Sequence, residues 1–182
     1  MRRLARPITA RYLESEATFY LERYPTTAEG LRRVLTRRVR KATMAEAPIV
    51  VEVEKVIDAI VAKFVHAGVV DDQAFAQTKA RVLHRRGSST RQTRQRLKLA
   101  GIDAETLDKA MAGLDQELDT DPQQREWQAA VALARRRRLG PFRQKDRKEH
   151  RARDLAAMAR GGFAYDLARK VIDAEERDII DP

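Results

Sequence analysis

The stretch over residues 64–76 constrains the fold more than any other part of the chain, because it combines a helix end, a tight corner and the next helix start. Upstream of the corner, apolar residues recur three and four positions apart, which predicts a helix with one continuous apolar face. Gly68 is the expected end of that helix, since glycine readily adopts a positive φ. Asp71 is expected to cap the next helix and Asp72 to lie at the positive end of its dipole. Phe75 then opens a second apolar face, so the stretch predicts a rigid joint between two packed helical units.

The composition favours an all-α protein with a buried core. Of the 182 residues 43% are hydrophobic, with alanine, leucine and charged residues dominant and β-branched runs scarce. The chain contains no cysteine, which excludes disulfides, thiol catalysis and cysteine-based zinc sites. No apolar run approaches the ~20 residues that a membrane span needs, and no secretory signal follows the first residues. We therefore expect a cytoplasmic protein that does not contact a membrane.

The first helical unit is expected over residues 8–68. Its first helix is predicted over residues 8–24, ending before Pro25 because the residue before a proline disfavours helical geometry. Five residues are expected on the buried side of this helix: Tyr12, Leu13, Phe19, Tyr20 and Tyr24.

The rest of the first unit is predicted as two further helices. A capping-box pattern at residues 26–29 opens the second helix, which is expected to reach about Val39 before a loop over residues 42–47. Pro48 suits the first turn of the third helix, although residues 49–53 are also compatible with a short strand.

Two further units are expected over residues 69–119 and 120–178. The pattern at residues 89–92 predicts another capping box in the second unit. Gly101 and Gly162 then occupy equivalent corners, each between a basic helix and a closing amphipathic helix. Such internal similarity is typical of helical arrays in which each unit buries its neighbour's flank. The predicted architecture is therefore an extended, curved array of three three-helix units.

The charge distribution favours a polyanionic partner. The formal net charge is +10, and no acidic residue lies between Arg81 and Lys98. The basic residues of this segment that we expect to contact a partner are Arg81, Arg85, Arg86, Arg91, Arg94 and Lys98. A second cluster comprises Arg135, Arg136, Arg137 and Arg138. The alternative is an ordinary solvated face, and guanidinium groups suit phosphates and carboxylates alike, so DNA and an acidic protein groove are not distinguished.

No group of residues has the pattern of a catalytic or metal site. Adjacent Asp71 and Asp72 are compatible with a metal or acid–base pair, but helix capping explains both of them. The three histidines, His66, His84 and His150, lack metal-ligand spacing and have no nucleophile beside them. We interpret Trp127 as a core residue rather than a base-stacking platform. We therefore expect no enzyme activity, no cofactor and no metal.

Three stretches carry specific motifs: Gly68-Val-Val-Asp-Asp-Gln-Ala-Phe-Ala76, Leu-Lys-Leu-Ala-Gly-Ile at residues 97–102, and Gly162-Phe163. Together they resemble the RecX family, the regulators of the bacterial RecA recombinase. The first is similar to the family's Gly-x-x-Asp-Asp-x-x-Phe-Ala joint, the second fits the same second unit, and the third is similar to the family's closing motif. The resemblance extends from about residue 8 to residue 175. The first unit matches loosely, because Thr26-Thr27 stands where the family usually has a serine-started pattern.

The resemblance implies a non-enzymatic, monomeric regulator of homologous recombination, DNA repair and the SOS response. Such a protein would lie in the groove of the RecA–DNA filament, limit filament extension and so inhibit RecA activities. The basic residues named above would make the contact with RecA or with single- or double-stranded DNA, and Gly68, Asp71, Asp72, Phe75, Gly101 and Gly162 would form the structural joints. The alternative is a sequence-tolerant DNA-binding protein of helix-turn-helix type; a weaker third option is a nuclease accessory enzyme.

Overall fold

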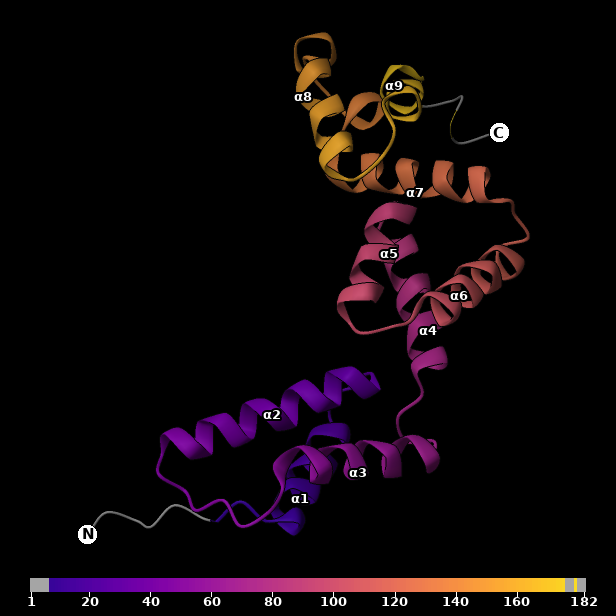
Figure 1. The fold of residues 1–182 in the computed structure, drawn as a ribbon. Helices are drawn as coiled ribbons and strands as arrows, with labels where there is room; N and C mark the ends of the chain where they lie inside the picture. Colours follow the sequence, from indigo (N-terminus) through magenta and orange to yellow (C-terminus); the bar gives the residue numbers. More distant parts are fainter. Residues whose placement is uncertain (1–6, 176–178, 180–182) are drawn as a thin grey trace. The chain divides into compact units, whose positions relative to one another are not determined.

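The computed structural model describes residues 7–175 and residue 179, and within them it contains nine α-helices, one 3-10 helix and no β-strand (Figure 1). The all-α expectation is therefore confirmed for the described part of the chain. The chain forms two compact units. The N-terminal unit comprises residues up to Phe75 together with residues 100–103, and the C-terminal unit comprises the remainder.

The helices follow one another as three consecutive triplets. The first triplet is α1 (Ala10–Leu21), α2 (Ala28–Met44) and α3 (Val53–His66). The second is α4 (Asp72–Arg85), α5 (Thr90–Leu99) and α6 (Ala104–Glu117). The third is α7 (Pro122–Arg137), the 3-10 helix η1 (Gly140–Phe142), α8 (Arg147–Arg160) and α9 (Tyr165–Asp173). The division of the chain into units at residues 8–68, 69–119 and 120–178 stays a prediction.

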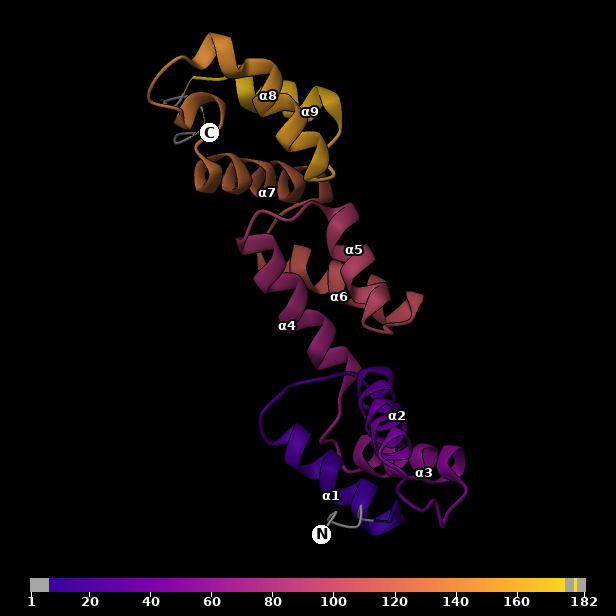
Figure 2. The same cartoon turned by 90° about the vertical axis from the view of Figure 1, so that its left-hand side faces the viewer.

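In the N-terminal unit, α1 packs against both α2 and α3, whose long axes run side by side (Figures 1 and 2). Each helix turns one apolar stripe inward, as its periodicity predicts. The fully buried large side chains of this core are Ile8, Leu13, Leu31 and Leu35. Val70, after the Gly68 corner, extends the same core.

The predicted boundary between α2 and α3 is wrong. Helix α2 continues to Met44 instead of ending near Val39, since the intervening residues include the good helix formers Lys41 and Ala42. Pro48 does not open α3, which begins at Val53. Pro48 instead lies in an extended segment, where its carbonyl accepts a hydrogen bond from the Ile8 N–H at 2.8 Å. Residues 49–53 do not form the alternative short strand; among them, only Ile49 makes an isolated parallel bridge, with Ile8.

The first helix is shorter than predicted, and this changes the position of its aromatic residues. Helix α1 ends at Leu21, so Tyr24 lies beyond it and is 55% exposed. Phe19 is 53% exposed, and the Arg23 guanidinium lies 3.8 Å from the centre of its ring. Leu13 is fully buried, as expected, while Tyr12 and Tyr20 are half-buried. The error for Phe19 arises because an aromatic side chain can cover its own helix surface under a cation instead of entering the core.

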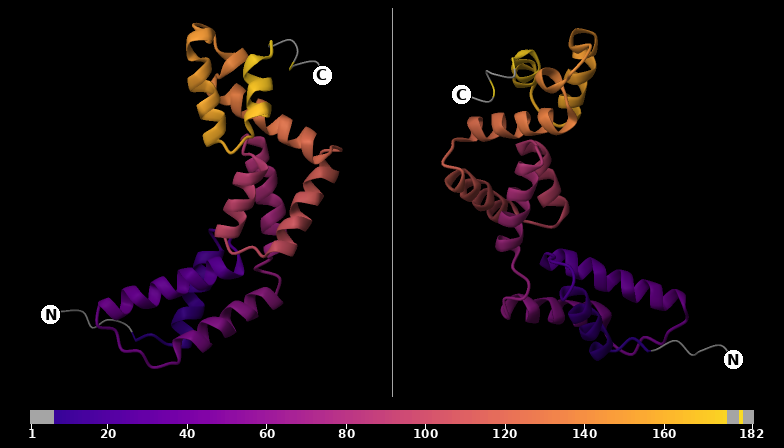
Figure 3. Two further views of the ribbon diagram at one scale, coloured as in Figure 1. Left: turned by 45° about the horizontal axis from the view of Figure 1, so that its top comes forward. Right: turned by 180° about the vertical axis from the view of Figure 1, so that it is seen from behind.

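In the C-terminal unit, α8 and α9 pack against each other and against α7 (Figures 2 and 3). Their core contains Leu133, Met158, Phe163, Val171 and Ile172. The corner after α4 contributes to the packing of α7, because Gly87 has a φ of +70° and a Cβ atom there would lie 2.4 Å from the Leu133 backbone nitrogen. Only glycine fits this close approach.

Candidate functional site

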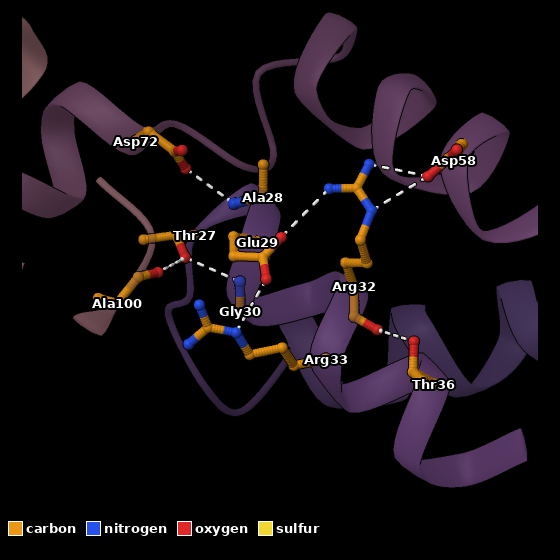
Figure 4. Close-up of polar contacts among 10 residues, drawn as sticks. All are labelled: Thr27, Ala28, Glu29, Gly30, Arg32, Arg33, Thr36, Asp58, Asp72 and Ala100. Carbon is orange, nitrogen blue, oxygen red and sulfur yellow. Dashed lines mark hydrogen bonds and ion pairs between the residues drawn. The ribbon is translucent and has the colours of Figure 1, made fainter. Parts of the chain in front are cut away.

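A hydrogen-bonded joint lies at the start of α2 (Figure 4). Thr27 is the N-cap of this helix, and its hydroxyl oxygen accepts a hydrogen bond from the Gly30 N–H at 2.9 Å. The same hydroxyl donates to the carbonyl oxygen of Ala100 at 2.5 Å. Asp72 Oδ1 accepts from the Ala28 N–H at 2.8 Å. The free N–H groups at the start of α2 are thus bonded by residues of both the first and the second triplet.

The start of α5 carries a second joint with the same design. The Ser89 hydroxyl accepts from the Gln92 N–H at 3.2 Å and donates to the carbonyl oxygen of Gly161 at 2.7 Å. Glu126 corresponds to Asp72, because its carboxylate also accepts from the first backbone N–H of the helix. Its Oε2 accepts from the Thr90 N–H at 2.8 Å and from the Thr90 hydroxyl at 2.6 Å. Both joints therefore combine an N-cap hydroxyl, a carbonyl beside a corner glycine and a carboxylate from the following triplet.

The structure confirms the cap predicted for Asp71 and corrects two other capping predictions, those for Asp72 and for residues 26–29. Asp71 Oδ1 accepts from the Ala74 N–H at 2.9 Å and so caps α4, whereas Asp72 caps α2 rather than serving only its own helix. The capping box expected at residues 26–29 does not form, because the N-cap is Thr27 and its third helical residue is Gly30, which has no side chain to reciprocate. Glu29 instead forms ion pairs with Arg32 and Arg33 (Figure 4).

Three of the six residues in the first predicted basic cluster line a groove of about 880 Å³ beside α5, which we call the α5 groove. Arg91, Arg94 and Lys98 lie on one face of α5, as their three- and four-residue spacing predicts. The remaining lining residues are Thr90, Gln95, Leu99, Glu126, Gly162 and Ala164. The groove is therefore lined by three cationic side chains of α5 and by the small residues Gly162 and Ala164 at the corner before α9.

Two of the predicted contact arginines have acidic partners that the local sequence does not reveal. Arg94 Nη2 lies 2.6 Å from Asp108 Oδ1, and Arg81 Nη2 lies 2.6 Å from Glu117 Oε2. Both acids belong to α6, so the acid-free run along the sequence is not acid-free in space. Because both pairs are largely exposed, each ion pair stabilises the fold only weakly. Arg94 still lines the groove, whereas Arg81 lies outside it.

The other predicted residues occupy separate places on the C-terminal unit. Arg85, from the end of α4, lies with Arg135 and Arg136 around a second groove of about 520 Å³, which we call the α7 groove. Trp127 is half-buried in the wall of this groove while packing against the core, so the core interpretation holds only in part. Arg86 and Arg137 are exposed and line neither groove, and Arg138 ends α7 in the left-handed region at a φ of +55°.

A buried arginine beside the start of α5 escaped the sequence interpretation. Arg125 is only 5% exposed, forms an ion pair with Asp115, and lies 3.4 Å from both the Thr90 hydroxyl and the Met111 carbonyl oxygen. Its Nε has no hydrogen-bond partner among the described residues. Helical spacing gives the missing signal, because Arg125 lies four residues before the buried Ala129 on the same face of α7.

Two ionisable groups of the C-terminal unit have shifted pKa values. Burial, assisted by the nearby Arg125 charge, lowers the pKa of His84 below its ordinary value. Burial alone raises the pKa of Asp154, but hydrogen bonds from Arg143 and the Gly140 N–H outweigh it, so this pKa lies below its ordinary value. Asp154 thereby stabilises the turn after α7.

Among the described residues, no three or more histidine or acidic side chains are grouped so that they could hold a metal ion. Within the same residues, no helix is both long and apolar enough to cross a membrane.

Comparison with known proteins identifies the family. A family model described as "RecX, second three-helix domain" matches residues 71–111. A Myxococcus xanthus (strain DK1622) protein named "Regulatory protein RecX" is 42% identical over 171 residues, which cover 93% of this chain and 88% of the relative. The chain belongs to the RecX family. A RecX protein from Thermobifida fusca (strain YX) is 32% identical over 160 residues, covering 85% of this chain and 76% of that protein.

Solved RecX structures share the fold. The crystal structure of RecX from Lactobacillus salivarius matches 90% of this chain and 94% of its own, with a TM-score of 0.61 and 17% identity. A second RecX crystal structure matches 91% of this chain and 72% of its own at the same TM-score. At this low identity the structural similarity shows a shared fold and nothing more. Membership of the RecX family rests on the sequence relatives, which are named regulatory proteins.

Proposed function

We propose that this RecX-family chain is a non-enzymatic, monomeric regulator of homologous recombination and DNA repair in the cytoplasm. It binds the RecA–DNA filament through the basic surface of its C-terminal unit. Bound there, it inhibits filament extension and with it the ATP turnover and strand exchange of RecA. It acts without a cofactor.

The observation that carries this proposal is the α5 groove. It presents the charges of Arg91, Arg94 and Lys98 on one exposed helix face beside a trough of about 880 Å³. Guanidinium and ammonium groups on one face suit a row of phosphates or carboxylates. The buried Arg125–Asp115 pair, which contacts Thr90, and the joint at Ser89 hold the start of α5 in place, so the helix that carries the cationic face is anchored to the core.

The decisive experiment measures RecA ATPase activity on single-stranded DNA with the wild type and with an Arg91→Glu/Arg94→Glu/Lys98→Glu variant. Charge-assisted contacts contribute about 1.5–3 kcal/mol each, so we expect the variant to need at least about ten times more protein for half-inhibition. The matched control is Arg37→Glu/Arg40→Glu/Lys41→Glu, which makes the same change of charge on exposed positions of α2. It should inhibit like the wild type. Absence of inhibition by the folded wild type would refute the proposed function.

The second candidate is a DNA-binding protein that acts without RecA. It is favoured by the exposure of Arg91 and Lys98, which are not ion-paired to any described residue and are accessible to the phosphates of free DNA. Binding of a labelled duplex by the wild type with nanomolar affinity at physiological salt, together with no effect on RecA, would favour this candidate over the first.

A further inference from the structure

The α7 groove is a continuous apolar stripe with a basic end. Trp127, Val131 and Ala132 line its middle, and they recur on one face of α7 at helical spacing. Gln124 and Gln128 lie along the same face, and Arg135 and Arg136 line its C-terminal end. This face is left partly open by the core of the C-terminal unit, which covers the other side of α7.

One aliphatic side chain from the end of the sequence already lies in this groove. Ile179 is among the lining residues and is only 7% exposed, although it lies beyond Asp173, where α9 ends. Ile179 is thus a buried aliphatic side chain in a groove that Trp127 and Val131 also line, and an apolar side chain set into a helix-lined groove acts as an anchor. The groove therefore has an occupant within the chain itself.

The sequence around this anchor is complementary in charge to the groove. Residues 175–181 read Glu-Glu-Arg-Asp-Ile-Ile-Asp, with four acids and one arginine. The groove contributes Arg85, Arg135 and Arg136, none of which is ion-paired to another described residue. Arg135 is held in place by stacking on the Phe142 ring at 5.2 Å from its centroid. An aliphatic anchor flanked by acids matches an apolar stripe flanked by arginines.

We propose that the α7 groove is a docking site for an acidic peptide with an aliphatic anchor, and that the chain's own segment 175–181 occupies it through Ile179. Docking of this segment does not depend on the proposed function. One consequence does rest on it: since Arg85, Arg135 and Arg136 are among the predicted contacts of the anionic partner, the docked segment competes with that partner for them.

The test uses Trp127, the single tryptophan of the chain, as a reporter inside the groove. In the full-length Ile179→Asp variant the anchor is lost, so Trp127 emission should shift to longer wavelength and acrylamide should quench it more strongly. Ile179→Val should behave like the wild type. The matched control is Ile49→Asp, an exposed aliphatic position of the N-terminal unit that is 46% exposed. Unchanged emission and quenching in Ile179→Asp, with helix content equal to that of the wild type by circular dichroism, would overturn the proposal.

A synthetic peptide with the sequence of residues 175–182 tests the identity of the occupant. A tethered ligand has an effective concentration in the millimolar range, so the peptide should bind the Ile179→Asp chain at least about ten times more tightly than the wild type. Adding Arg85→Glu and Arg136→Glu to that chain should abolish binding. Equal affinity for the wild type and Ile179→Asp would overturn docking in cis. So would a Trp127 emission that changes with wild-type dilution, since the occupant would then be a second copy.

Discussion

At the scale of single residues, the most consequential side chain is Arg125, a charged group in the interior of the C-terminal unit. Its ion pair with Asp115 compensates a charge that is otherwise removed from water. It also contacts Thr90, the residue that Glu126 holds at the start of α5. The position of the basic face of α5 therefore depends on a buried polar cluster.

We expect Asp115→Ala to lower the free energy of unfolding by about 3–5 kcal/mol, because it leaves the Arg125 charge buried without a partner. Urea denaturation followed by circular dichroism measures this loss. The matched control is Asp108→Ala, which breaks the exposed pair with Arg94 and should cost only about 0–1 kcal/mol. Equal losses for both variants would show that Arg125 is not effectively buried.

His84 predicts a pH dependence of stability. Because burial and Arg125 lower its pKa in the folded chain, the unfolded chain binds the proton more readily. The free energy of unfolding should therefore fall as the pH drops through the ordinary histidine pKa of about 6.5. His84→Gln should reduce this fall between pH 7 and pH 5, measured by urea titrations. A pH profile identical for His84→Gln and the wild type would contradict this assignment.

Residue identity and spacing predicted the shared face of Arg91, Arg94 and Lys98, because helical geometry is local. They did not predict that Asp108 faces Arg94, since that pairing depends on how α6 packs against α5. Arg125 was missed for a related reason: its spacing from the buried Ala129 indicates the core face of α7, but a charge at such a position is expected inside only when its partner is known, and that partner, Asp115, lies in another helix.

At the scale of secondary-structure elements, the two joints show how one helix terminus is completed by residues distant in the sequence. Thr27 and Ser89 each accept from their own helix and donate to a carbonyl more than seventy residues away, at Ala100 and Gly161. Each joint lies within one compact unit. Because one hydroxyl bonds both to its own helix and to a distant carbonyl, the loss of either segment's structure weakens the hydrogen bonding of the other.

The adjacent aspartates predict opposite patterns of amide hydrogen exchange. Asp72→Ala removes the acceptor of the Ala28 N–H, so exchange at Ala28 should accelerate while exchange at Ala74 stays unchanged. Asp71→Ala removes the cap of α4 and should accelerate Ala74 instead. Each lost cap should also cost about 0.5–2 kcal/mol of stability. Acceleration of the same amide by both substitutions would contradict the division of roles.

The ends of helices were predictable only where the chemistry is local. The corner at Gly68 adopts a φ of +69°, and α4 begins at Asp72, as the joint sequence predicts. The end of α2 was placed several residues too early, because nothing local distinguishes a basic helix that continues to Met44 from a loop. The position of Pro48 depends on pairing with Ile8, a contact between distant segments that no local pattern encodes.

At the scale of the whole molecule, the formal charge of +10 gives a measurable signature of any phosphate contact. If the residues of the α5 groove bind DNA phosphates, the affinity must fall steeply with salt. If they bind carboxylates of a protein, the dependence is shallower, because no condensed counterions are released.

We expect the Arg91→Glu/Arg94→Glu/Lys98→Glu variant to show a shallower salt dependence in the presence of the RecA–DNA filament. Three lost phosphate contacts reduce the slope of log affinity against log salt by about 3 for duplex DNA. The measurement is fluorescence anisotropy from 50 to 200 mM salt, and the α2 variant at Arg37, Arg40 and Lys41 is the control. A slope equal to that of the wild type would contradict phosphate contacts by these three residues. If the variant then also binds more weakly than the wild type, the residues contact carboxylates instead.

The two joints give the middle triplet acceptor groups for the first triplet and donor groups for the third. Asp72 and Ala100 receive the first triplet, and Ser89 and Thr90 engage the third. One bonding pattern, used twice, therefore ties the middle triplet to its neighbours on either side in the chain.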